Sequence, residues 1–363
     1  MHLCGFEILP SHILPEALPY AAASRLPWFL CINCGIWSDF FFEMRKNANI
    51  QPMKINMKYR RRILQALAIS GTLPIAGWPL TTLAAGNALA SEKITDRLIR
   101  MSGAGGNVVL YLGNDNASVI DSGSSEHAQS LISLISELAD SKPIMNLFNT
   151  HWHDDHTGGN ELFHSHGVNI IAHENTRLWL GADFDVEWRN WTHKPRPAEA
   201  LPDETFYISG TKDLGGEIVQ YHHYEQAHTD GDIALFFPDS NVLVAGGLLS
   251  DGRYPTPDIA TGGWIGGLIR ANEAMLELVD DNTLIIPDQG STKTRSDLLA
   301  QHAMLSDLYE KMKTLARQGY SAQNMLEANV TEGYDEAWGD PEEFILEAYR
   351  GMWAHSRDMG GFI

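Results

Sequence analysis

The chain has 363 residues, 44% of them hydrophobic and 20% charged, so it has enough apolar material for a sizeable core and does not have the composition of a disordered protein. Residues 1–90 hold 8 of the 26 Lys and Arg and 4 of the 46 Asp and Glu, which leaves 18 basic and 42 acidic residues, a formal charge of −24, in the remainder. Such a surface repels phosphate backbones and anionic lipid headgroups, which argues against nucleic acid or a membrane as the main partner.

All three cysteines, Cys4, Cys31 and Cys34, precede residue 91, so the remainder can form no disulfide and has no thiolate ligand or cysteine nucleophile. Cys31 and Cys34 have the spacing of a redox or zinc pair, but no second pair accompanies them and no site is predicted there. Residues 1–56 are expected to be an upstream extension without a functional role, because an export signal that starts at Met57 is complete by itself.

Residues 57–90 have the three-part order of an export signal: a basic start, an apolar segment, and Ala88-Leu89-Ala90 as a cleavage site before Ser91. Arg60-Arg61-Arg62-Ile63-Leu64-Gln65 resembles the twin-arginine signal, with Gln65 where a lysine is usual. The resemblance implies recognition by the twin-arginine export machinery and a bacterial periplasmic or secreted location. A basic helix start leading into a core helix is the alternative, and the position of the cleavage site disfavours it.

After Ser91 the chain alternates β-rich and helical patterns and contains no run of 18 apolar residues, so neither a membrane span nor a stable membrane anchor is predicted. The first series predicts strands at 107–112 and 117–121 around a turn at 113–116, a helix at 128–138 and a strand at 144–148. The second predicts strands at 168–172, 217–221, 233–237, 242–245 and 284–286, and helices at 268–279, 295–316 and 341–352.

No low-complexity linker separates the two series, so residues 91–363 are interpreted as one domain. The pattern predicts an α+β fold in which two mixed β-sheets pack together with helices outside. The last helices are expected to cover one sheet face.

Three histidines and two aspartates lie within six consecutive positions after the strand at 144–148, in Asn149-Thr150-His151-Trp152-His153-Asp154-Asp155-His156-Thr157-Gly158-Gly159-Asn160. If that strand stays extended through His153, alternation points His151 and His153 at one place. Asp155 and His156 are expected to approach the same place from a loop. Imidazole suits zinc, iron, copper or nickel, so the segment predicts a site for a divalent metal.

This His-x-His-x-Asp-His pattern resembles the signature of the metallo-β-lactamase-fold hydrolases, and the likeness extends over most of residues 95–305. The resemblance implies an αββα four-layer sandwich with a metal site at the sheet edges. Asp121 matches the strand-end aspartate that supports the metal loop, and His228, in His228-Thr229-Asp230-Gly231-Asp232, matches a further ligand of the first metal. The first site is then His151, His153 and His228, and Asp155 and His156 belong to the second.

Two positions depart from the family pattern. Gly246-Gly247 stands where the family usually has a metal-bridging aspartate, and Pro287-Asp288-Gln289-Gly290 stands where it usually reads Pro-Gly-His-Gly. We therefore expect one tightly bound zinc ion and a weak or absent second one. Whether Asp288 or Gln289 rebuilds the second site through oxygen is left open.

Three histidines with one open position are typical of catalytic zinc, which lowers the pKa of its bound water to about 7. The sequence predicts a hydrolase in which zinc-bound hydroxide attacks a small ester, lactone, thioester or amide, β-lactams included, while Asp155 carries the proton. The drug-hydrolysing members often have a lysine where this chain has Ser250. Arg253 or Lys293 are candidates to bind a substrate carboxylate, and His222 or His223 could face the pocket.

Two other functions remain open. A mononuclear iron oxidoreductase of the same fold is disfavoured because its usual aspartate ligand is Gly247 here. A non-catalytic relative with a degraded second site is the other. The sequence makes no prediction of the oligomeric state.

Overall fold

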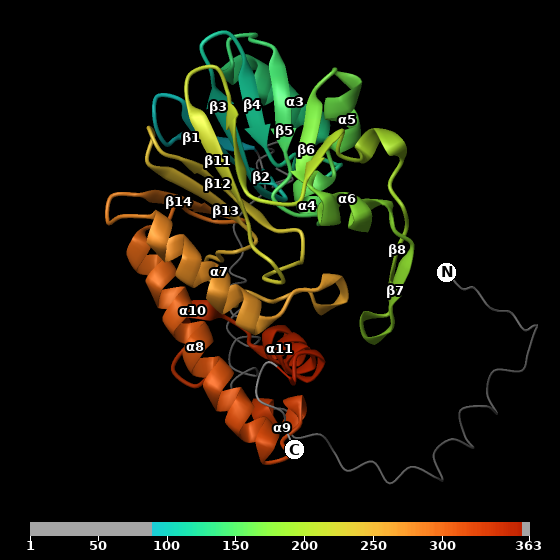
Figure 1. Ribbon diagram of the computed structural model, residues 1–363, viewed down its shortest axis with the longest axis vertical. Coiled ribbons are helices and arrows are strands. Elements are labelled where there is room, and N and C mark those ends of the chain that lie inside the picture. The colour runs from blue at the N-terminus through green and yellow to red at the C-terminus, as the bar shows by residue number, and fades with distance from the viewer. Residues whose placement is uncertain (1–88, 358–363) are drawn as a thin grey trace, which may run out of the picture. The chain divides into compact units, whose positions relative to one another are not determined.

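Two β-sheets face each other in the part of the chain that the structure, a computed structural model, describes: residues 89–357 (Figure 1). The predicted extension at residues 1–56 and nearly all of the export signal at 57–90 lie outside the described residues. None of the described helices is both long enough and apolar enough to cross a bilayer.

The first sheet has seven strands, and it is mixed, as predicted. Strands β1 to β4 pair antiparallel and β4, β5, β6 and β9 pair parallel. In spatial order the strands are β1 (Ala90–Lys93), β2 (Leu98–Ala104), β3 (Gly106–Leu112), β4 (Ala117–Ile120), β5 (Ile144–Phe148), β6 (Asn169–His173) and β9 (Glu204–Phe206).

The second sheet has five strands and is also mixed, because β10 to β13 pair antiparallel and β14 joins β13 in parallel. Its order is β10 (Gly210–Asp213), β11 (Ile218–His223), β12 (Ile233–Phe237), β13 (Val242–Gly246) and β14 (Leu284–Pro287). A separate hairpin of β7 (Phe184–Val186) and β8 (Trp191–His193) extends away from both sheets (Figure 1).

Strand β3 shows why its sequence forms the middle of a layered structure. Val109 and Tyr111 belong to the apolar cluster between the two sheets, whereas Val108 and Leu110 belong to the cluster on the opposite face. Because successive side chains of a strand alternate between faces, a strand that is apolar at every position must be covered on both. The αββα class that the sequence predicted is confirmed.

Helices cover the outer face of each sheet. On the first sheet these are α3 (Ala128–Leu138) and α5 (Asn160–Ser165), which share one core with β3, β5 and β6. The C-terminal helices pack on the second sheet, as expected, and bury one cluster with Leu243 and Ile285. They are α7 (Ile265–Leu278), α8 (Arg295–Arg317), α9 (Ala322–Glu327), α10 (Asp335–Trp338) and α11 (Glu342–Ala354).

The predicted strands and helices all form, with ends within three residues of those expected. The sequence missed β1, β2, β9, β10 and the β7–β8 hairpin, and also the short helices α4 (Asp154–Thr157), α5, α6 (Glu174–Gly181), α9 and α10. Strand β2 lacks a regular alternation because its pairing with β3 shifts between Met101 and Ala104, and all four residues of β1 are exposed. Such strands carry little hydrophobic periodicity, which is the signal that sequence analysis depends on.

Candidate metal centre

The histidine-rich segment follows β5, but it is not an extension of that strand. Strand β5 ends at Phe148, and a one-turn helix, α4 (Asp154–Thr157), begins directly after His153. The expectation of an extended chain through His153 is therefore wrong, and Asp155 and His156 lie on this helix rather than in a loop. Thr157 closes the turn, because its hydroxyl donates to the carbonyl oxygens of Trp152 and His153 at 2.9 and 3.0 Å.

Asp121 holds the segment from the end of β4, in the supporting position that the resemblance implied. Its Oδ1 accepts the backbone N–H of Thr150 at 2.7 Å, and its Oδ2 accepts the Thr150 hydroxyl and lies 2.8 Å from Nδ1 of His156. Burial alone would lower the pKa of His156, but the carboxylate outweighs burial and raises that pKa to about 9. The φ of Asp121 is +62°, a conformation that aspartate tolerates better than most residues.

Four imidazole rings meet at the edge of the sandwich. The rings of His151, His153 and His228 lie 4.8 to 4.9 Å apart, centre to centre, and the ring of His156 lies 4.3 Å from that of His151. Each set His151/His153/His228 and His151/Asp155/His156 offers three ligand atoms within 4.8 Å of one another. The structure thus brings all five predicted ligands together, with His151 common to both sets.

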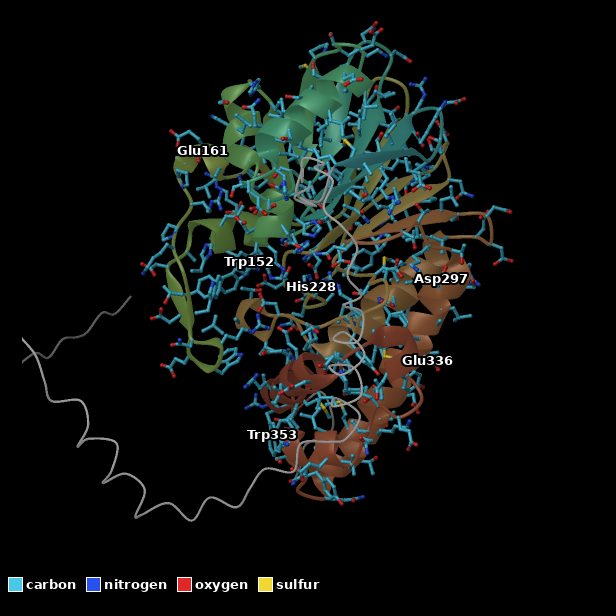
Figure 2. The ribbon with its side chains drawn as sticks, turned by 180° about the vertical axis from the view of Figure 1, so that it is seen from behind. Trp152, Glu161, His228, Asp297, Glu336 and Trp353 are labelled. Carbon is cyan, nitrogen blue, oxygen red and sulfur yellow. The ribbon has the colours of Figure 1, made fainter. Side chains whose placement is uncertain are left out.

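His228 reaches the cluster from the loop between β11 and β12. Asp232 fixes this loop, because its Oδ2 accepts the backbone N–H groups of His228 and Thr229 at 2.6 and 2.7 Å. Figure 2 shows His228 and Trp152 between the strands and the C-terminal helices. The buried Asp232 is part of the segment that the resemblance singled out, but the sequence assigned it no role.

Asp258 is a residue of this cluster that sequence reasoning missed. Its buried carboxylate lies 3.1 Å from Nε2 of His153 and accepts the hydroxyl of Thr261 at 2.7 Å. Burial alone would raise the pKa of Asp258, but the interactions with His153 and Thr261 outweigh burial and lower that pKa to about 2. Asp258 lies 105 residues after His153, so no local spacing could have signalled this pair.

Hydrogen bonds to the rings of His151, His153 and His156 indicate which nitrogen of each is left for a metal. Nδ1 of His151 lies 3.0 Å from the Thr150 hydroxyl, whose proton goes to Asp121, so Nδ1 of His151 donates and Nε2 is left. By the same reasoning His153 donates from Nε2 and keeps Nδ1. His156 donates from Nδ1, and its Nε2 is buried without a hydrogen-bond partner among the described residues. Nδ1 of His228 is likewise buried without a hydrogen-bond partner among the described residues. Ring nitrogens left in this way fit a metal ion, whose histidine ligands usually donate their other N–H to a nearby acceptor.

Burial and the charges of the neighbouring histidines hold the pKa of His151 well below its usual range. Its ring is therefore neutral, the form that binds a metal. For Asp155, burial alone would raise the pKa, but His156, His153 and a hydrogen bond from Gln289 outweigh burial and lower that pKa. Asp155 is thus an ionised carboxylate at the edge of the cluster.

The two positions that depart from the family pattern both lie at the cluster. A Cβ atom at Gly247 would lie 2.2 Å from Nδ1 of His228, so the histidine ring occupies the space that a side chain at 247 would need. Gln289 donates from Nε2 to Oδ2 of Asp155 at 3.1 Å. Asp288 is buried, and the Arg253 guanidinium pairs with it.

A cavity of about 390 Å³ opens over the cluster. Arg253 and Ser250 line it together with Arg189, Tyr254, Asp258 and Asp288. Lys293 does not line this cavity and pairs with Asp251 at 2.5 Å. Neither His222 nor His223 lines it, and the ring of His223 stacks on that of His173 at 3.7 Å.

The chain is similar to known proteins over most of this region. Residues 102–300 match the family model described as the metallo-beta-lactamase superfamily. A metallo-beta-lactamase from Pontibacter korlensis is 20% identical at a TM-score of 0.50, over 60% of this chain and 99% of that one. The stereoselective inverting sec-alkylsulfatase Pisa1 from Pseudomonas sp. is 16% identical at a TM-score of 0.56, over 73% of this chain and 50% of that one. At these identities the two structures show a shared fold.

Proposed function

This chain belongs to the metallo-beta-lactamase superfamily, and from that premise we propose that it is a hydrolase that works with one tightly held zinc ion. The proposed substrates are small esters, lactones, thioesters or amides, β-lactams among them. The observation that supports this most strongly is the set of three ring nitrogens, on His151, His153 and His228, that converge within 4.8 Å.

Zinc bound by three histidines with one open position lowers the pKa of a water molecule to about 7 and polarises the electrophile. The chain's own residues arrange this chemistry. Asp121 holds Thr150, whose hydroxyl lies beside the ring of His151; Asp258 fixes the ring of His153, and Asp232 fixes the loop that carries His228. Rings held in this way need no reorganisation when the metal binds, which raises its affinity.

Asp155 is the proposed proton carrier. Its carboxylate is ionised, lines the cavity, and is oriented by the amide of Gln289. From this place it can accept the proton of the attacking water and pass it to the leaving group.

The second set of ligands supports a site that is weak or unused. Gly247 offers no side chain, and the amide nitrogen that Gln289 directs at Asp155 is a hydrogen-bond donor, which cannot coordinate a cation. His156 and Asp155 then serve the first site, His156 as packing beside His151 and Asp155 as the acid and base.

Single replacements of His151, His153 and His228 by Ala test this proposal, with His166→Ala, an exposed histidine, as the control. Each of the three variants is expected to lose both zinc and turnover across a panel of aryl esters, lactones and a β-lactam, and the control should keep both. If the unchanged protein binds metal but turns over no compound of the panel, the alternative of a non-catalytic relative would be favoured. Bound iron in place of zinc would favour the oxidoreductase.

We further propose that the protein is exported by the twin-arginine route and cleaved after Ala90. The sequence order of residues 57–90 supports this, and the cleavage bond would lie at the start of β1, an edge strand whose residues are all exposed. Arg60→Lys combined with Arg61→Lys should keep the uncut protein in the cytoplasm. Unchanged export of that double variant would overturn the assignment.

A further inference from the structure

The β7–β8 hairpin belongs to neither sheet of the sandwich and points toward α11 (Figure 1). Among the described strands, its two strands pair only with each other, over three residues each. A two-stranded hairpin of this size is marginally stable by itself in water. Contacts at its base and at its tip must therefore hold it in place.

Aromatic packing fixes the base of the hairpin to the body of the protein. The ring of Phe184 lies 5.2 Å from that of Trp179 and 5.9 Å from that of Trp152, and the ring of Trp191 lies 6.1 Å from that of Trp152. Such ring pairs stabilise a contact beyond the area that they bury. Trp152 directly follows His151, so the base of the hairpin is anchored beside the histidine cluster.

One carboxylate of α11 holds the tip of the hairpin. Oε1 of Glu347 accepts hydrogen bonds from Nε1 of Trp188 at 3.0 Å and from Nε of Arg189 at 3.3 Å, both residues of the tip. The same oxygen accepts from Nη1 of Arg350 at 2.9 Å, and the Arg350 guanidinium lies 5.4 Å from the centre of the Trp188 ring. Glu347 is only 2% exposed, although it is an acidic residue. We call the contact of Glu347 with Trp188 and Arg189 the latch.

The latch leaves one polar atom unsatisfied. Oε2 of Glu347 is buried and has no hydrogen-bond partner among the described residues. A buried acceptor without a donor is unfavourable, whereas the same atom in water is hydrogen-bonded. Lifting the tip would expose Glu347 and let water donate to Oε2, which offsets part of the hydrogen-bond energy lost at Oε1. The unsatisfied oxygen therefore lowers the free energy needed to open the latch.

Arg189 connects the latch to the cavity over the histidine cluster. Its Nη1 lies 3.8 Å from Oδ1 of Asp258 and its Nη2 lies 3.7 Å from Oε1 of Glu343, and all three residues line that cavity. At these distances neither ion pair is a hydrogen bond, so the bond from Nε of Arg189 to Glu347 is the closest of the three contacts. Arg189 thus spans from Asp258 to Glu343, and it would leave the wall of the cavity if the tip lifted.

We propose that the β7–β8 hairpin is a movable strap on one side of the cavity over the histidine cluster, and that Glu347 is the latch residue that holds it closed. With the tip lifted, the cavity is wider and admits larger molecules. The strap controls access alone, so it goes beyond the proposed function and does not depend on the metal or on the reaction.

Trypsin cleavage after Arg189 reports the state of the latch, because the protease must bind the arginine side chain that three carboxylates hold in the closed state. Glu347→Leu keeps the bulk of the residue but has no acceptor, so the full chain should be cut after Arg189 about tenfold faster than the unchanged protein. Trp188→Phe removes one donor only and should give a several-fold increase. Glu336→Leu, at an exposed position of α10, is the control and should leave the rate unchanged.

Cleavage after Arg270, in the middle of α7, measures global unfolding in the same digests and should stay slow in every variant. Unchanged cleavage after Arg189 in Glu347→Leu would overturn the latch. An equal rise after Arg189 and Arg270 would mean that Glu347→Leu unfolds the whole domain. In that case Trp188→Phe decides, and the latch is wrong if cleavage after Arg189 does not rise selectively in that variant.

A thiol introduced at Thr256, which lines the cavity over the cluster, tests whether the strap narrows that cavity. The described residues contain no cysteine, so mass spectrometry of the peptide around residue 256 measures the labelling of this thiol alone. In Thr256→Cys, a bulky fluorescein maleimide should react several-fold faster once Glu347→Leu is added, or Trp188→Phe if the first variant unfolds. The small N-ethylmaleimide should react about equally fast with and without the added substitution.

Equal rates with the bulky maleimide would show that the hairpin does not narrow the cavity, and the strap is then wrong. Neither measurement requires zinc or turnover. A protein without metal or activity that shows both effects keeps the strap and overturns the hydrolase, and an active zinc enzyme that shows neither effect overturns only the strap.

Discussion

The amide nitrogen of Gln289 donates a hydrogen bond over 3.1 Å to Oδ2 of Asp155, at the position where the family resemblance led us to expect a metal-binding histidine. In the proposed one-zinc site, this contact orients the carboxylate of Asp155 as the proton carrier. Whether a second metal ion binds therefore depends on whether Asp155 acts as a metal ligand or as a proton carrier.

Asp155→Asn should keep its zinc and lose turnover by about 100- to 10,000-fold, the usual cost of removing a general acid or base. Asparagine keeps the size of the side chain and one acceptor oxygen but cannot take the proton. Metal analysis and ester turnover on the same preparation check this. Loss of zinc together with activity would make Asp155 a ligand. Full activity would favour Asp288 as the proton carrier over Asp154, because Asp288 lines the cavity over the cluster and Asp154 does not.

Much of the fold was predictable because its central strands are continuous apolar runs. Strand β12, at Ile233–Phe237, is predictable because all of its residues are apolar. Helix α3 is predictable because apolar residues such as Leu131 and Ile135 recur on one face at helical spacing. The β7–β8 hairpin was not predictable. Its strands have three residues each, and what fixes its tip is Glu347, more than 150 residues away along the chain.

The five candidate ligands were found because four of them lie within six positions of one another. The residues that orient them were not all visible in this way. Asp121 could be identified from the resemblance, but Asp258 lies in a long loop without a recognisable motif, and only the folded chain brings it to His153. The reason why residue 247 is a glycine could not be predicted either, because the His228 ring that fills the space beside it comes close only in the folded chain.

Gly247→Ala is expected to lower the zinc content. The added methyl group would lie 2.2 Å from Nδ1 of His228, so the ring must move out of the cluster. Gly181→Ala is the control, since its added Cβ would meet only Leu201, at 3.8 Å. The measurement is the number of zinc ions per chain in the two purified variants. Full zinc occupancy in both would contradict the prediction, because it would show that the His228 ring can shift without lowering zinc affinity.

Asp258→Asn should weaken zinc binding by about 10- to 100-fold, the usual effect of losing an acceptor behind a histidine ligand. The neutral amide oxygen of asparagine accepts the N–H of His153 more weakly than the charged carboxylate does. Competition with a chelator of known affinity measures the change, with the exposed Asp239→Asn as a control for the lost charge. Equal affinities in Asp258→Asn and the unchanged protein would remove the orienting role of this carboxylate.

Acid should destabilise the fold through His173, outside the metal cluster. Nδ1 of His173 accepts the N–H of Asn175 at 3.2 Å and caps α6, and burial together with the nearby His223 lowers the pKa of His173 to about 4. The unfolded chain then takes up a proton near pH 6.5 and the folded chain only near pH 4. The free energy of unfolding contributed by this group is complete above about pH 6.5 and falls as the pH drops toward 4.

His173→Asn keeps a capping acceptor without a titrating ring. Urea denaturation at pH 7 and pH 5 should therefore show a smaller loss of unfolding free energy in the variant than in the unchanged protein. The same loss in both would mean that His173 is not the group that titrates.

The number of zinc ions per chain tests the account most directly, because the proposed chemistry depends on one site made by His151, His153 and His228. Protein purified without a chelator should contain close to one zinc per chain by plasma mass spectrometry, and His228→Ala, purified in the same way, should contain almost none. Two tightly bound metal ions per chain, or full zinc in His228→Ala, would contradict it.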